Sequence, residues 1–192
     1  MLGTGPDAGQ ARSEHPGLTC ITATASVAAG QDIMRRAAAN LKRISLELGG
    51  HAPFIVMPDA DIEAAAKATM RRSFSNMGQT CITVNRIVTH EQVHDDFVQA
   101  LSVDTRAIKP GRDPDPGVTY GPVTKEAAIN RAQCHIDDAV KKSARIIIGG
   151  DRVTKGRLSN GFFIAIASDL RTAMLSICHA SIDGTIDGLS PP

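Results

Sequence analysis

The sequence predicts an α/β protein, because strand-like segments alternate with alanine-rich segments of helical length along its 192 residues. Residues 44–48 alternate apolar and polar side chains, which is the period of a strand. Residues 54–57 and 146–148 are short continuous apolar runs, which are typical of buried strands. Because helical segments separate these strands along the chain, we expect mainly parallel pairing.

A helix is predicted over residues 28–40, which are rich in alanine and end at Asn40, a residue that often stops helices. The strand of residues 44–48 comes next, and Gly49 and Gly50 end it. This succession of helix and strand is the first repeat of the α/β alternation.

The next helix is predicted over residues 62–74, after Pro58 has halted the apolar strand of residues 54–57. Asp59 or Asp61 can cap this helix, because a carboxylate at that position accepts a hydrogen bond from a free backbone N–H of the first turn. The segment therefore has both a stop signal before it and a start signal of its own.

The alternation continues with a strand over residues 86–89 and a helix over residues 93–101. The helix carries its apolar side chains on one face. That face consists of Val93, Phe97, Val98 and Leu101.

Residues 110–121 are rich in proline and glycine and predict a loop. A long amphipathic helix is expected over residues 125–142. The apolar strand of residues 146–148 follows, and we expect Gly149 and Gly150 to stop it.

The composition is that of a soluble globular protein, with 42% hydrophobic and 21% charged residues. The net charge is +1, and acidic and basic residues are mixed, so we expect neither nucleic acid nor a membrane surface as a partner. No apolar run approaches the roughly 18 residues that a membrane helix needs. These features predict a cytoplasmic protein.

The four cysteines stand far apart in the sequence, and no two of them form a C-x-x-C pair. We therefore expect neither a zinc site nor a thioredoxin-type redox site, and no metal. In a reducing compartment the thiols are expected to be free. The cysteines are Cys20, Cys81, Cys134 and Cys178.

Two short motifs carry the chemistry of this chain. Glu47 stands in Leu-Glu-Leu-Gly-Gly, and 34 positions later Cys81 closes the segment Gly-Gln-Thr-Cys. A thiol suits nucleophilic attack because its ordinary pKa of about 8.5 is easily lowered, and a carboxylate suits activation of water. In this order and at this separation, the two motifs resemble the general-base and nucleophile motifs of the aldehyde dehydrogenase superfamily, most closely its succinate-semialdehyde dehydrogenases.

The resemblance implies a partial aldehyde dehydrogenase fold. Residues 1–48 would be the tail of a Rossmann-like cofactor domain, and residues 49–168 the first part of the catalytic domain. Residues 169–192 are expected to be a divergent tail, because the family's paired-glutamate motif is not found there. The full-length family forms oligomers through an arm that we do not find in this sequence.

The resemblance also implies a reaction with a small-molecule aldehyde and NAD or NADP. The thiolate of Cys81 would add to the aldehyde carbon, hydride would leave to the nicotinamide, and Glu47 would activate the water that hydrolyses the thioester. The backbone N–H of Cys81 would supply half of an oxyanion hole. Arg86 is a candidate to bind the carboxylate of an acidic substrate, and the alternative is that Asn85 and Arg86 have a structural role.

The expected cofactor contacts are Gly5 and Gly9, in a glycine-rich turn, together with Ser26 and Gly49. Ala25 stands where the family has a glycine beside the cofactor, and a Cβ there can obstruct a close approach. The family's second oxyanion donor and its ribose-binding lysine would lie before Met1. We therefore expect little or no dehydrogenase turnover from this chain alone.

Each interpretation has an alternative. Cys81 could be a buried small apolar residue, Glu47 could point to solvent, and His51 is expected to be a hydrogen-bonded structural histidine. At the level of function, the chain could be a non-catalytic remnant that acts through protein contacts. It could also be a cofactor-free thiol esterase that uses the same thiol and carboxylate.

Overall fold

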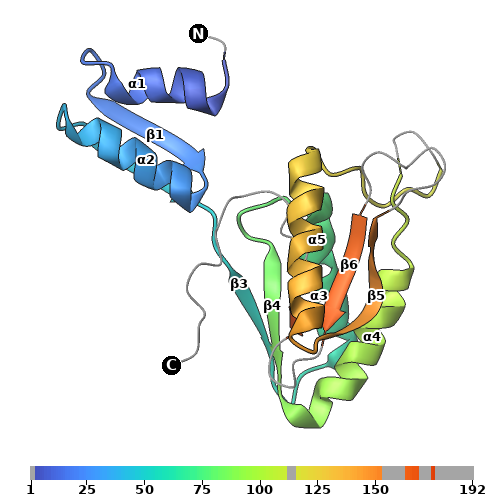
Figure 1. The fold of residues 1–192 in the computed structure, drawn as a ribbon. Helices are drawn as coiled ribbons and strands as arrows, with labels where there is room; N and C mark the ends of the chain where they lie inside the picture. The colour runs from blue at the N-terminus through green and yellow to red at the C-terminus, as the bar shows by residue number, and fades with distance from the viewer. Residues whose placement is uncertain (1–2, 112–115, 153–162, 169–173, 176–192) are drawn as a thin grey trace. The chain divides into compact units, whose positions relative to one another are not determined.

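The computed structural model describes residues 3–111, 116–152, 163–168 and 174–175. Between Gly50 and His51 the chain divides into two compact units (Figure 1). Within the described ranges, no helix is both long and apolar enough to cross a membrane. The alternation of helices and strands confirms the predicted α/β class.

The first unit is a strand–helix–strand repeat preceded by a short helical segment. Its two strands, β1 (Cys20–Ala25) and β2 (Arg43–Leu48), pair in parallel along their whole length. The helical elements are η1 (Gly5–Gly9), a π-helical turn, α1 (Gln10–Glu14) and α2 (Val27–Ala38). Strand β1 is absent from the sequence-based expectation, because Ala and Thr supply most of its side chains and give little apolar contrast.

A buried lysine holds the turn between α1 and β1. The Lys42 ammonium donates hydrogen bonds to the carbonyl oxygens of His15, at 2.7 Å, and Leu18, at 2.9 Å. Lys42 is only 7% exposed, so these two bonds satisfy donors that burial would otherwise leave unpaired. They tie the beginning of β2 to the chain before β1.

The second unit contains most of the described helices and strands. Strand β3 (Ala52–Val56) pairs in parallel with β4 (Val84–Thr89), and β4 pairs antiparallel with β7 (Met174–Leu175). Strand β5 (Arg145–Arg152) pairs antiparallel with β6 (Phe163–Ser168). The expectation of mainly parallel pairing is therefore right for β1–β2 and β3–β4 only. The helical elements of this unit are α3 (Ile62–Phe74), η2 (Ser75–Gly78), η3 (Glu91–Val93), α4 (His94–Arg106) and α5 (Glu126–Lys141).

The start of α3 lies where the sequence predicts it. Asp61 is the cap, since its carboxylate accepts a hydrogen bond from the N–H of Ala64 at 3.0 Å. The strand before α3 ends at Val56, one residue earlier than predicted. The long helix α5 also agrees with its prediction to within one residue at each end.

Strand β5 corrects one expectation. It does not stop at Gly149 and Gly150 but runs through both residues to Arg152. The two glycines have φ of +71° and +91°, and the pairing register with β6 shifts between Gly149 and Asp151. The glycine pair therefore makes a bulge inside the strand rather than a stop.

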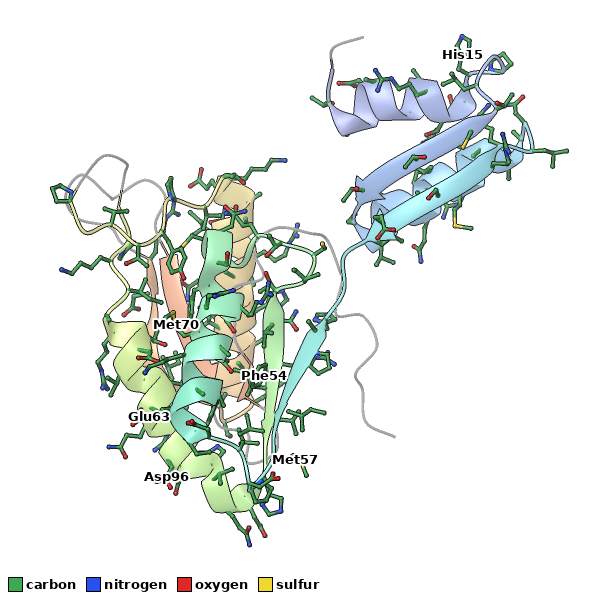
Figure 2. All side chains as sticks on the ribbon, turned by 180° about the vertical axis from the view of Figure 1, so that it is seen from behind. His15, Phe54, Met57, Glu63, Met70 and Asp96 are labelled. Atoms are coloured by element: carbon green, nitrogen blue, oxygen red, sulfur yellow. The ribbon has the colours of Figure 1, made fainter. Side chains whose placement is uncertain are left out.

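Two apolar clusters form the core of the second unit. The first lies between the β3–β4 strands and helices α3 and α4, and Phe54 and Met70, both labelled in Figure 2, pack against it. The predicted apolar face of α4 is confirmed, because Phe97 is fully buried and Leu101 is 3% exposed. The second cluster joins α5 to Met77 and Val123. The first cluster consists of Val56, Ala66, Phe74, Val84, Ile87, Phe97, Leu101 and Ile108.

Candidate active site

Cys81 lies in an exposed turn between η2 and β4. The N–H of Thr83 donates to the carbonyl oxygen of Thr80 at 3.2 Å, which places Cys81 and Ile82 at the centre of a four-residue turn. The thiol is free and the residue is exposed. The alternative in which Cys81 is a buried apolar residue is therefore wrong.

The backbone N–H of Cys81 makes no hydrogen bond with any residue of the described ranges. A free N–H at the nucleophile can donate to an oxygen that gains negative charge during attack by the thiolate. The geometry of the turn therefore suits acyl-transfer chemistry.

The turn is preceded by three successive residues in the left-handed region, which L side chains rarely adopt. The φ angles are +52° for Asn76, +56° for Met77 and +72° for Gly78. Each non-glycine residue in this region costs about 1–2 kcal/mol. Met77 offsets part of this cost, because its side chain is 3% exposed and packs in the second apolar cluster.

Three hydroxyl groups brace the turn from within. The Thr83 hydroxyl donates to the carbonyl oxygen of Gly78 at 3.0 Å, so it accepts from the Thr80 hydroxyl at 2.6 Å. The Ser73 hydroxyl donates to the carbonyl oxygen of Val84 at 2.8 Å. These bonds link both sides of Cys81 to α3 and β4.

Glu47, the predicted base, lies on β2 in the first unit and is exposed. Its Cα partner across the parallel pair is Thr24, and its neighbours on the same face of β2 are Ser45 and Arg43. Since Cys81 belongs to the second unit, each of the two residues is placed only within its own unit. The role of Glu47 stays a prediction.

Ser26 has a donor set that fits a phosphate. Its hydroxyl oxygen accepts from the N–H of Ala29 at 3.1 Å and caps α2, which leaves its O–H as a donor. The N–H groups of Val27 and Ala28, in the first turn of α2, donate no hydrogen bond within the described ranges. Such a helix N-terminus is suited to anions. Gly49 offers no N–H, because it donates to the carbonyl oxygen of Ala25 at 3.2 Å.

The glycine-rich segment near the start of the chain is helical, whereas the sequence predicts a turn there. Gly5 and Gly9 lie in the continuous helical segment of η1 and α1, and Gly9 has an ordinary helical φ of −67°. A Cβ added at either glycine would meet no atom within 4 Å. Nothing in the described structure therefore requires glycine at these positions, and their contact with a cofactor stays a prediction.

Asn85 and Arg86 lie on β4, shortly after Cys81 in the sequence. Asn85 is 4% exposed, and its Nδ2 donates to Nδ1 of His51 at 2.7 Å. Its Oδ1 is buried and has no partner in the described ranges. His51 is thus a hydrogen-bonded residue, as expected.

Arg86, the predicted substrate contact, is half-buried and pairs with no carboxylate among the described residues. Its guanidinium can therefore bind the carboxylate of a ligand.

The sequence gives no sign of one contact at the site. Thr124 lies far from Cys81 in the sequence, but its N–H and its hydroxyl both donate to Oε1 of Gln79, each at 3.0 Å. Gln79 stands two residues before Cys81. No local pattern predicts a bond between residues 45 positions apart.

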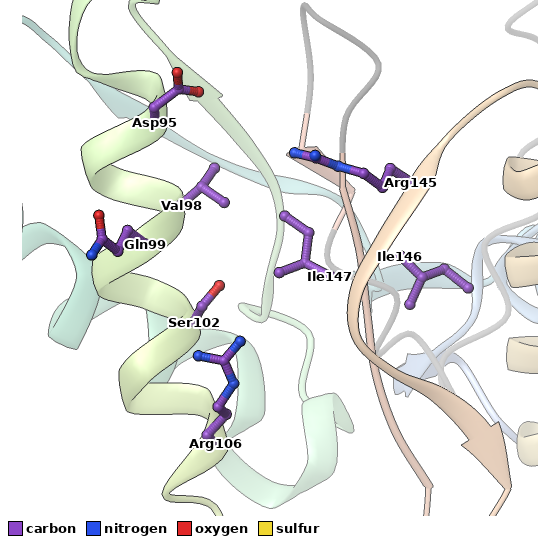
Figure 3. A pocket seen from close by; sticks show the side chains of 8 residues that line it. All are labelled: Asp95, Val98, Gln99, Ser102, Arg106, Arg145, Ile146 and Ile147. Carbon is purple, nitrogen blue, oxygen red and sulfur yellow. The ribbon is translucent and has the colours of Figure 1, made fainter.

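A surface groove of about 540 Å³ lies elsewhere in the second unit, between α4 and the beginning of β5 (Figure 3). None of the predicted site residues lines it. Among the described residues, no group of His, Cys, Asp and Glu side chains is arranged to hold a metal ion. The groove is lined by Asp95, Val98, Gln99, Ser102, Arg106, Arg145, Ile146 and Ile147.

The described residues thus form an α/β chain with a free thiol exposed in a turn. Its sequence matches the aldehyde dehydrogenase family over residues 1–177. The chain belongs to this family. The matched residues include the first part of the segment expected to diverge from residue 169 onward.

Its relatives are much longer than the chain itself. It is 40% identical over 156 residues to a mitochondrial succinate-semialdehyde dehydrogenase of Arabidopsis thaliana, covering 81% of this chain and 30% of the relative. It is 41% identical over 136 residues to succinate-semialdehyde dehydrogenase [NADP(+)] 1 of Schizosaccharomyces pombe, covering 71% and 27%. The chain thus spans about a third of the length of these relatives.

A solved structure supports the fold. The structure of lactaldehyde dehydrogenase from Escherichia coli matches with a TM-score of 0.80 and 34% sequence identity. The match covers 86% of this chain and 34% of that protein. The partial aldehyde dehydrogenase fold predicted from the sequence is confirmed by this likeness.

Proposed function

We propose that this chain carries the nucleophile and the base of an aldehyde dehydrogenase that oxidises an aldehyde to the acid. One observation carries the proposal: Cys81 is exposed at the centre of a turn and its backbone N–H is unpaired within the described residues. The family supports a dehydrogenase reaction at this thiol.

At Cys81 the thiolate attacks the aldehyde carbon, so that a carbon–sulfur bond forms and the carbonyl electron pair moves to oxygen. The N–H of Cys81 donates to this oxyanion and stabilises it. A nicotinamide dinucleotide, when bound, would supply the hydride acceptor that conversion of this adduct into a thioester requires. Ser26, with the free N–H groups at the start of α2, would hold the phosphates of that cofactor.

Glu47 takes the proton from the water that hydrolyses the thioester. Its exposed carboxylate on β2 is accessible to water, which this role requires. Hydrolysis releases the acid and returns Cys81 to its thiol form. The alternative in which Glu47 only points to solvent predicts no loss of turnover in Glu47→Gln.

We propose succinate semialdehyde or a similar acidic aldehyde as the substrate, because two relatives bear that name and Arg86 can pair with a carboxylate. NAD and NADP both stand as cofactors, and the name of the yeast relative favours NADP. A cytoplasmic location and the absence of nucleic-acid and membrane partners stay predictions. Oligomers are expected for the longer proteins of the family.

We expect weak or no turnover from the 192 residues alone, because they span about a third of their relatives. Loss of a single oxyanion donor already lowers turnover by a factor of about 10²–10³. The test is formation of reduced cofactor with succinate semialdehyde and NADP, then NAD, beside Cys81→Ala. Turnover near that of a whole dehydrogenase would contradict the expected weakness, and turnover that survives Cys81→Ala would contradict the proposed function.

A cofactor-free thiol esterase is the second candidate. The exposed thiol and free N–H of Cys81 serve ester cleavage equally well, and this reaction needs no hydride acceptor. Steady hydrolysis of an activated ester that is lost in Cys81→Ala and indifferent to NADP would favour it. A non-catalytic remnant predicts neither reaction, and self-association in gel filtration would support it.

A further inference from the structure

Gln79 forms a hydrogen-bonded clasp beside the nucleophile. Its Oε1 accepts from the N–H and the hydroxyl of Thr124, each at 3.0 Å, and its Nε2 donates to the carbonyl oxygen of Asn76 at 2.9 Å. The side-chain amide of Asn76 donates in return to the carbonyl oxygen of Gln79 at 3.2 Å. We call these four bonds the Gln79 clasp.

The clasp opposes the strain of the turn. Asn76 and Met77 are held at positive φ, a conformation that their side chains disfavour, so the segment before Cys81 would relax if its restraints were removed. Met77 is fixed from one side by the apolar cluster. Thr124 supplies the restraint from outside the turn, because it belongs to the chain just before α5.

We propose that Thr124 is a positioning residue for Cys81 and acts through Gln79. Its two hydrogen bonds keep the turn in the orientation in which the N–H of Cys81 faces the oxyanion formed during attack. The proposal rests on the proposed function, because it assigns to Thr124 a part in acyl transfer at that thiol. The role assigned to Thr124 is indirect, because the hydrogen bonds of its N–H and its hydroxyl go to Gln79 and not to Cys81.

Two reactions of the Cys81 thiol distinguish a positioning role of Thr124 from a change in how accessible that thiol is. With p-nitrophenyl acetate, the Cys81 thiolate attacks the carbonyl carbon and the electron pair moves to oxygen. The oxyanion then collapses, expels p-nitrophenolate and leaves an acetylated Cys81. With iodoacetamide, the thiolate displaces iodide from carbon and no oxyanion forms. Only the first reaction needs the N–H of Cys81 in place.

The experiment measures both rates at Cys81, by mass spectrometry of its peptide, in the whole chain and its variants. Thr124→Val removes the hydroxyl donor and keeps the N–H donor, Thr124→Ser keeps both, and Gln79→Met removes every side-chain bond of Gln79. Thr119→Val is the matched control, since its hydroxyl accepts from the N–H of Lys109 and is not bonded to Gln79.

Loss of one hydrogen bond is expected to lower the rate constant for acetylation by a factor of about five. We therefore expect Cys81 to be acetylated about fivefold more slowly in Thr124→Val, and more slowly still in Gln79→Met. Thr124→Ser and Thr119→Val are expected to keep the original rate, and alkylation is expected to stay constant throughout. Equal acetylation in all variants, or a parallel loss of alkylation, would overturn the positioning role alone. No acetylation of Cys81 in the unsubstituted chain, despite normal alkylation, would overturn the proposed function and this inference with it.

Discussion

Nδ2 of Asn85 lies 2.7 Å from Nδ1 of His51, and this hydrogen bond joins two segments that follow the predicted catalytic residues. His51 stands four residues after Glu47, and Asn85 stands four residues after Cys81. Because Asn85 donates to Nδ1, it selects the neutral tautomer of His51 with its proton on Nε2. The bond therefore fixes how the chain enters β3 relative to β4.

Asn85→Ala is expected to lower the free energy of unfolding by about 1–2 kcal/mol. Loss of the bond to His51 and the small void outweigh the gain from removing Oδ1, which is buried without a partner among the described residues. The measurement is denaturant unfolding followed by circular dichroism. Asn130→Ala is the matched control, since Asn130 is exposed on α5. Equal stability of the two variants would show that the bond to His51 contributes nothing.

Thr69→Val is expected to stabilise the chain by about 1 kcal/mol. Thr69 is fully buried on α3, and its hydroxyl has no partner in the described part of the chain. A valine of nearly the same shape removes the cost of an unpaired buried hydroxyl. Thr105 is also buried, but its hydroxyl donates to the carbonyl oxygen of Leu101 at 2.7 Å. We expect Thr105→Val to lower the free energy of unfolding, as measured by denaturant unfolding. A change of the same sign in Thr69→Val and Thr105→Val would contradict these predictions.

Gly9→Ala is expected to raise the free energy of unfolding by about 0.5–1 kcal/mol, because Gly9 has a helical conformation and open space around its Cα. Thermal unfolding measures the effect. The same variant tests the predicted cofactor contact, since a Cβ against a pyrophosphate would reduce the rise in Tm that NADP produces. An unchanged rise would remove Gly9 from the predicted cofactor site.

Stability is expected to fall with rising pH in the alkaline range because of Tyr120. Burial raises the pKa of its hydroxyl above the ordinary 10.0, and the nearby Arg71 guanidinium lowers it to a smaller extent. The folded chain therefore holds the phenol proton more tightly than the unfolded chain. The corresponding stability is complete below pH 10 and is lost as the pH rises through the raised pKa. Tyr120→Phe, compared by thermal unfolding across this range, is expected to show a smaller fall.

Local signals predict much of this fold. The end of β3 agrees with Pro58, which cannot donate to a strand ladder, and the start of α3 follows from the capping carboxylate of Asp61. Strand β1 escapes prediction because its alternation is between small and polar residues, and its identity depends on pairing with β2. Gly149 and Gly150 show that a glycine pair can bend a strand without ending it.

The candidate site also contains some residues that the sequence predicts and others that it does not. Cys81 is predictable from the residues beside it, and its exposure in a turn agrees with a nucleophile. Thr124 is not, because its bond to Gln79 depends on how the chain before α5 folds back against η2. The unpaired N–H of Cys81 is equally hidden from the sequence, since it results from the path of the backbone.

If Cys81 is an acyl-transfer nucleophile, it must react differently from Cys20 and Cys134, which are also exposed and free. The most direct measurement is the rate at which p-nitrophenyl acetate acetylates each of these three thiols in the folded chain, read by peptide mass spectrometry. We predict that the ratio of acetylation rate to iodoacetamide alkylation rate is higher for Cys81 than for Cys20 or Cys134. Acetylation of all three in proportion to their alkylation would contradict it.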